Sequence, residues 1–191
     1  MGALTFLFTL LLLIIMMSAT MAATSSSQTY NTYVKTACNS TTYPQICYKS
    51  LSSYASSIKS NPQKLCNYAL SVTLKAARNA SSTVSELSKK KGLTQAEVGV
   101  VKDCIENIKD SVDELKQSVT AMSNLGGADI KYQLDDIKTW VSASLTDEDT
   151  CTEGFDEQKV STTVKNTINK SIVTVARLAS NALSLIDSLN Y

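Results

Sequence analysis

Residues 101–115 have the sequence VKDCIENIKDSVDEL, in which apolar side chains recur at alternating steps of four and three positions. The apolar positions are Val101, Ile105, Ile108, Val112 and Leu115. This spacing places one apolar stripe along the face of an α-helix. The stretch therefore predicts a long helix that buries the stripe against neighbouring helices.

Signals that start and stop helices occur on both sides of this stretch. Asn61-Pro62 pairs a favourable N-cap with a favourable first-turn residue, and the segment that follows ends in three lysines before Gly92. Thr94 and Glu97 have the spacing of a capping box, which begins the helix that contains residues 101–115. Two long helices joined by a short turn are therefore predicted.

Apolar stripes predict two further helices on the C-terminal side. One covers residues 129–145, with a shorter extension that carries Cys151 and Phe155, and the other covers residues 161–189. Glycine and proline are scarce, and no segment shows the sustained alternation of a strand. Long helices with short connections favour an all-α fold, an antiparallel up-down four-helix bundle over residues 61–191.

The N-terminal part of the chain carries two predicted units. Residues 1–22 are interpreted as a secretory signal peptide, because an uncharged apolar run of about 14 residues, too short for a membrane span, precedes small residues suited to cleavage. The remaining residues, 23–191, are long enough for one domain with a sizeable core. Within them, residues 23–60 are predicted to form a helical hairpin around a turn at residues 41–44.

Composition excludes several classes of function. The 18 basic and 17 acidic residues leave a formal charge of +1, which provides no overall field for nucleic acid or an anionic membrane. The chain has no histidine, which removes the usual zinc ligands and the Ser-His-Asp and Cys-His routes to a nucleophile. Asp135-Asp136 and residues 147–149 are interpreted as a solvated helix face and a helix-end loop. No enzyme activity, metal or cofactor is predicted.

Cysteine usage points to a chain stapled by disulfides. The five cysteines, in a secreted chain, suggest two disulfides and one free thiol. Five choices of free thiol and three connectivities for each leave fifteen pairings. Cys66 lies on the apolar stripe of its helix and is predicted to be the buried free thiol. Three sequons are candidate N-glycosylation sites, at Asn39, Asn79 and Asn169.

The polar face of residues 101–115 carries an acidic row, defined as Glu106, Asp110 and Asp113. Lysines at 102, 109 and 116 interleave with the row, so helical salt pairs explain part of it and favour a solvated face. A surface that meets a partner is the alternative. Apolar stripes that line a lipid-carrying cavity are a second alternative, although such stripes usually face a core.

Three motifs resemble the plant inhibitor family that targets invertase and pectin methylesterase. They are TACNSTTYPQICYKSL (36–51), DCIENIKDSVDEL (103–115) and DIKTWVSASLTDEDTCTEGF (136–155). The resemblance spans essentially all of residues 23–191. It implies a four-helix bundle with an N-terminal helical hairpin, and a secreted protein inhibitor. It also implies two disulfides, Cys38–Cys47 and Cys104–Cys151.

The C-terminal stretch VARLASNALSLIDSL (175–189) resembles the pectin methylesterase inhibitor branch, and the Pro-Lys-Phe stretch associated with invertase inhibitors is absent. Members of that branch use acidic residues against the basic, substrate-binding cleft of the enzyme. The matching positions here are Glu106, Asp110, Asp113 and Glu153. The resemblance thus implies an extracellular partner, plant pectin methylesterase in a 1:1 complex, with an invertase inhibitor as the alternative.

Overall fold

The computed structural model describes residues 26–157 and 159–190, and every regular element within them is helical. A first helix covers residues 26–38. The elements that follow are α2 (Pro44–Leu51), the 3-10 helix η1 (Ser52–Tyr54), α3 (Ala55–Ile58), α4 (Pro62–Ser88), α5 (Gln95–Ser123), α6 (Ile130–Glu157) and α7 (Thr162–Asp187). The signal peptide predicted for residues 1–22 lies outside the described residues.

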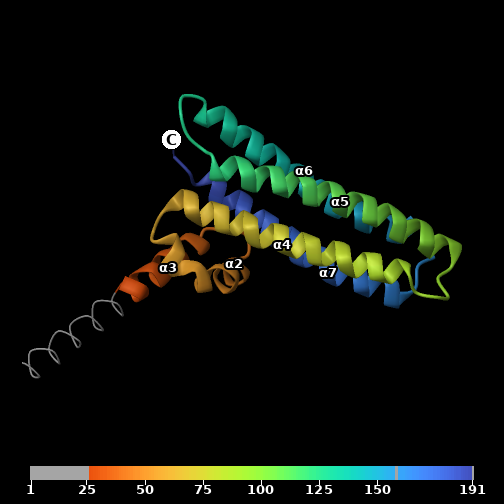
Figure 1. Cartoon of the computed structure of the whole chain (residues 1–191). Helices are drawn as coiled ribbons and strands as arrows, with labels where there is room; N and C mark the ends of the chain where they lie inside the picture. Colours follow the sequence, from red (N-terminus) through yellow and green to blue (C-terminus); the bar gives the residue numbers. More distant parts are fainter. Residues whose placement is uncertain (1–25, 158, 191) are drawn as a thin grey trace, which may run out of the picture.

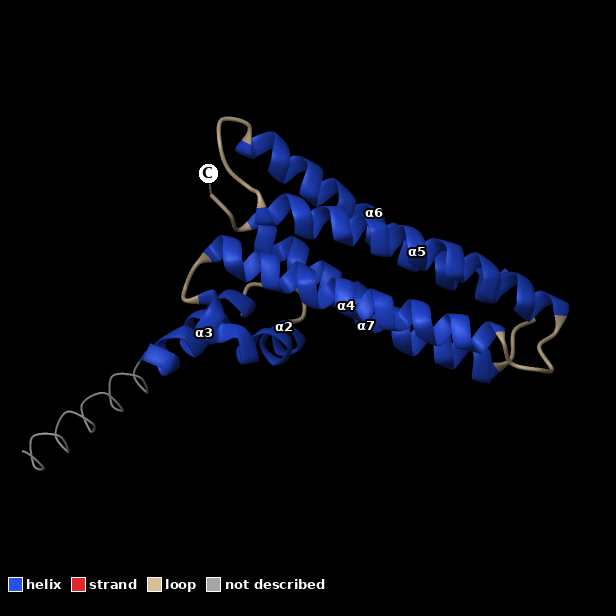
Figure 2. Ribbon diagram, viewed as in Figure 1, coloured by secondary structure: helices blue, strands red, loops and turns tan. Residues whose placement is uncertain are grey.

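The four long helices form an antiparallel bundle, as predicted (Figure 1). Helix α5 packs on α6 and on α4, and α7 packs on α4 and on α6, so α5 and α7 lie on a diagonal. Successive helices run up and down the bundle, and short loops join them (Figure 2). Because every helix has two long neighbours, each one can bury a continuous stripe of side chains.

The buried stripe of α5 repeats with steps of three and four residues, which is the heptad pattern of a helical bundle. Its members are Val101, Cys104, Ile108, Ser111, Leu115, Ser118 and Met122. The predicted stripe shares three of these positions, but Ile105 and Val112 are only half-buried. The seam instead includes a cysteine and two serines, since small side chains allow close approach to α6.

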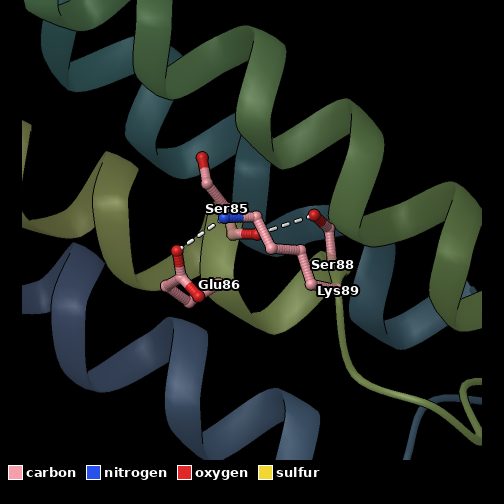
Figure 3. Close-up of polar contacts among 4 residues, drawn as sticks. All are labelled: Ser85, Glu86, Ser88 and Lys89. Carbon is pink, nitrogen blue, oxygen red and sulfur yellow. Dashed lines mark hydrogen bonds and ion pairs between the residues drawn. The ribbon is translucent and has the colours of Figure 1, made fainter.

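Both ends of α4 match their predicted signals. The Asn61 side chain accepts a hydrogen bond from the Lys64 backbone at 2.8 Å. At the other end the Lys89 ammonium lies 2.7 Å from the Glu86 carboxylate, and the Ser88 hydroxyl donates to the Ser85 carbonyl at 2.7 Å (Figure 3). Gly92 then has a positive φ of 90°, which allows the chain to reverse towards α5.

Glu97 completes the predicted capping box and also ties two helices together. One carboxylate oxygen accepts from the backbone N–H of Thr94 at 2.9 Å, and the other accepts from the backbone N–H of Ser161 at 3.0 Å. Ser161 is itself the N-cap of α7. The pKa of Glu97 is lowered to about 2, first by a hydrogen bond with the Ser161 side chain and then by those from the backbones of Thr94 and Ser161.

The N-terminal helices pack on α4 and α7 at one end of the bundle (Figure 1). The disulfide Cys38–Cys47 closes the hairpin, with 5.5 Å between the Cα atoms. Buried Asn181 of α7 then pairs with the backbone of Tyr43, accepting from its N–H at 2.8 Å and donating to its carbonyl at 3.0 Å. The guanidinium of Arg177 lies 5.4 Å from the Tyr43 ring centroid.

The C-terminal half of α6 corrects two predictions. The predicted helix end at residue 145, followed by a shorter extension with Cys151 and Phe155, is wrong, because α6 continues without a break to Glu157. Residues 147–149 are accordingly inside the helix, and Glu148 is only 1% exposed, so the interpretation of a solvated loop is also wrong for this residue. The disulfide Cys104–Cys151 and buried Phe155 hold this segment on α5, which outweighs the low helical propensity of its threonines and aspartates.

Candidate functional site

The acidic row lies on the outer face of α5, opposite the stripe that the helix buries. Glu106, Asp110 and Asp113 are all exposed. At the rise of an α-helix the row is about 10 Å long. The α5 and α6 side of the bundle faces away from the N-terminal hairpin, so these carboxylates lie on an open side of the molecule (Figure 1).

One of the three carboxylates in this row has an ion-pair partner within the described residues. Lys102 lies 4.0 Å from Glu106, and both side chains are exposed, so this pair contributes little. Among the described residues, Asp110 and Asp113 form no ion pair, although the lysines at 109 and 116 are close in sequence. Only one of the interleaved lysines thus pairs with the row, and two carboxylates remain available to an external partner.

The disulfide Cys104–Cys151 holds the row in register with α6. The Cα atoms of its cysteines are 4.3 Å apart, and both side chains are buried. Glu153 lies two residues beyond the bridge and is exposed. Because α5 and α6 are antiparallel, Glu153 and Asp113 mark two ends of a surface about 16 Å long. The structure therefore places all four predicted residues on one helix pair.

Two grooves flank Asp113, one on each side of α5. The larger, of about 510 Å³, separates α5 from α6, and Trp140 and Ala121 line its wall. The smaller, of about 220 Å³, separates α5 from α4 and includes Arg78 and Lys109. Asp113 thus stands on a ridge between two depressions, which is a shape that can fit between side chains of a partner. Sequence reasoning did not find these grooves, because they depend on how three helices pack.

The remaining site predictions have mixed outcomes. Cys66 is a free thiol and is 1% exposed, as predicted, and burial raises its pKa to about 12. Asn39 and Asn79 are exposed, whereas Asn169 is half-buried. Their glycosylation stays a prediction.

Metal-binding clusters and membrane-spanning helices are both absent from the part of the chain that the structure describes. No three acidic, cysteine or histidine side chains in residues 26–157 and 159–190 are grouped so that they could hold a metal ion. None of the helices in the same ranges is long and apolar enough to cross a membrane. The four predicted contact residues are exposed carboxylates on two helices that a disulfide joins.

Comparison with known proteins identifies a family that matches most of this chain. The family model described as "Plant invertase/pectin methylesterase inhibitor" matches residues 32–185. The chain belongs to this family. Pectinesterase inhibitor 4 of Arabidopsis thaliana, a family relative, is 48% identical over 162 residues, which cover 83% of this chain and 81% of the relative.

Two other similar proteins support the family membership and the fold. Pectinesterase inhibitor 10 of Arabidopsis thaliana is 46% identical over 169 residues, or 87% of this chain. The match covers 54% of that relative, so this chain spans about half of its length. A crystal structure of a mutant form of a pectin methylesterase inhibitor from Arabidopsis has a TM-score of 0.64, 18% identity and coverage of 80% of this chain and 94% of that one. The predicted fold is thereby confirmed.

Proposed function

We propose that this protein is an inhibitor of plant pectin methylesterase that binds the enzyme reversibly and without a covalent bond. The observation that carries the proposal is the acidic row, whose carboxylates at Asp110 and Asp113 have no ion-pair partner among the described residues. It lies on a chain 48% identical to a protein named pectinesterase inhibitor 4. The proposed contact residues are Glu106, Asp110, Asp113 and Glu153.

Charge complementarity explains why such a surface suits this target. Pectin freed of its methyl esters carries carboxylates, so an enzyme cleft that retains it needs cationic groups. A rigid row of carboxylates can occupy the same cleft and block it sterically. Because the row offers no methyl ester at a cleavable position, the enzyme has nothing to hydrolyse. Inhibition should weaken as salt screens the exposed charges.

Rigidity is the second requirement, since ordering a flexible surface would subtract from the binding free energy. The row lies within a long helix that is packed on two neighbours and bridged to α6 at Cys104. The partner therefore meets carboxylates at fixed spacing. An inhibitor of this kind is not an enzyme and needs no cofactor.

The cellular setting belongs to the same proposal. Residues 1–22 would act as a signal peptide, and residues 23–191 would form the inhibitor domain in the extracellular space, where pectin lies. The sequons at Asn39, Asn79 and Asn169 would then be exposed to the N-glycosylation enzymes of the secretory pathway. Asn79 lines a groove between α4 and α7, which is distinct from the two grooves that flank Asp113.

Charge reversal tests the proposal. Glu106→Lys with Asp110→Lys is expected to raise the inhibition constant against a plant pectin methylesterase at least ten-fold, or about 1.4 kcal/mol. The matched control is Asp135→Lys with Asp136→Lys, two exposed carboxylates elsewhere on the surface, and it should change the constant less than about two-fold.

Equal effects of the two double variants would remove the acidic row from the contact surface. Parallel assays against acid invertase test the alternative that the family description leaves open. Inhibition of invertase together with no inhibition of pectin methylesterase would refute the proposed target.

A further inference from the structure

Three carboxyl groups lie along the contact between α5 and α6, and each has an oxygen that is closed to solvent and lacks a hydrogen-bond partner. They belong to Glu114 of α5 and to Asp147 and Glu148 of α6, and we call them the carboxyl cluster. Glu148 is 1% exposed and occupies a core position of the bundle. Its other oxygen accepts from the Ser111 hydroxyl at 3.2 Å. One neutral donor is poor compensation for a buried negative charge.

Within the described residues, the charged groups that shift the pKa values of the cluster are other carboxylates. The charge of Asp110 on α5 contributes to the raised pKa of Glu114 and of Asp147. The charge of Asp149 on α6 contributes to the raised pKa of Glu148. No lysine or arginine within the described residues forms an ion pair with any member of the cluster. The core layers on either side of Ser111 are completed from α4 and α7 by apolar side chains, namely Ala77, Ala80, Val84, Ile172 and Val175.

Burial therefore opposes ionisation of the whole cluster. It raises the pKa of Glu148 to about 8, and the neighbouring aspartates add to this shift. Burial also raises the pKa of Glu114, with a further contribution from Asp147. A proton on Glu114 can be donated to Asp147, which allows these two carboxyl groups to lie side by side. The cluster is thus compatible with the folded bundle when it holds protons.

We propose that the carboxyl cluster is a pH-sensitive contact between α5 and α6, intact while its members are protonated and weakened when they ionise. The sign follows from linkage. A carboxyl group whose pKa is higher in the folded chain contributes stability that is fully present below its unfolded value, near 4.5 for Glu148, and that is lost as the pH rises towards 8. The bundle is accordingly more stable in mildly acidic solution than above neutral pH.

Unfolding across pH 5 to 9 tests the cluster without any enzyme, so the result is independent of the proposed function. Between about pH 5.5 and 7.5 the folded chain retains a proton at Glu148 that the unfolded chain releases. The folding constant of the wild-type chain should therefore fall about ten-fold more per pH unit than that of Glu148→Gln, whose side chain cannot ionise. Asp136→Asn, an exposed change on the same helix, should follow the wild type.

Identical pH slopes for the wild type and Glu148→Gln would overturn the proposal. If Glu148→Gln does not fold, the proposal can be tested in the wild-type chain by following the ¹³C NMR signal of the Glu148 carboxyl group as the pH changes. Titration of the Glu148 carboxyl above pH 7 supports the proposal, and a midpoint below pH 5.5 overturns it. The double change Glu114→Gln with Asp147→Asn should likewise reduce the pH slope.

Discussion

Replacing Asn181 with alanine should weaken the docking of the N-terminal hairpin on the bundle while the bundle stays folded. Asn181 is 2% exposed, and its two hydrogen bonds to Tyr43, at 2.8 and 3.0 Å, join positions 138 residues apart. Each bond contributes about 1 kcal/mol net, and the Tyr43 N–H left without a partner adds about 1 kcal/mol. The Tyr43 carbonyl keeps the bond from the Cys47 N–H, so the expected total is about 3 kcal/mol.

Amide hydrogen exchange resolves this effect by position. A loss of about 3 kcal/mol corresponds to about a hundred-fold faster exchange in α2, because its amides open with the hairpin. The amides of α5 should be unchanged, since the seam between α5 and α6 does not involve Asn181. The control is Asn166→Ala, an exposed change on the same helix.

Unchanged protection of α2 in Asn181→Ala would refute the reasoning. So would an equal loss of protection in α2 and α5, because the hairpin would then unfold only with the whole bundle.

Two further perturbations concern the bridges between helices. Changing Cys104 and Cys151 to serine opens a loop of 47 residues. The free energy of unfolding, measured with denaturant, should fall by up to about 4 kcal/mol. A fall of less than about 1 kcal/mol would contradict this prediction. The pKa of Glu97 is lowered by hydrogen bonds from Ser161 and Thr94, so its stabilising effect is present above about pH 4.5 and is lost as the pH falls towards 2. The melting temperature of Glu97→Gln should therefore fall less between these pH values than that of the wild type. Equal falls in melting temperature would contradict a stabilising role for these hydrogen bonds.

Local sequence signals predicted where α4 and α5 begin. Asn61, Thr94 and Ser161 act within three residues of their own position, and each caps the helix that it precedes. Such interactions depend on neighbours along the chain, so the sequence contains all of their partners. The exposure of the acidic row was also predictable, because helical periodicity places it opposite the apolar stripe.

Which residues of α5 face the core was harder to predict from the sequence. An apolar stripe on α5 pointed to Ile105 and Val112, whereas the packed seam uses Cys104 and Ser111. The choice between these phases depends on which helix lies opposite. The heptad pattern of α6, continued past Val141, would have indicated the burial of Glu148.

The sequence by itself determined an all-helical chain with four long helices, their capping residues and an exposed acidic face, since these follow from side chains a few residues apart. Only the tertiary structure decided that α6 continues through residues 147–149, that Asn181 binds the backbone of Tyr43, and that Asp110 and Asp113 have no ion-pair partner in the described chain. Each of these depends on groups distant in sequence or on which side chains approach one another. Their energies arise only when the helices pack, and for that reason no local pattern encodes them.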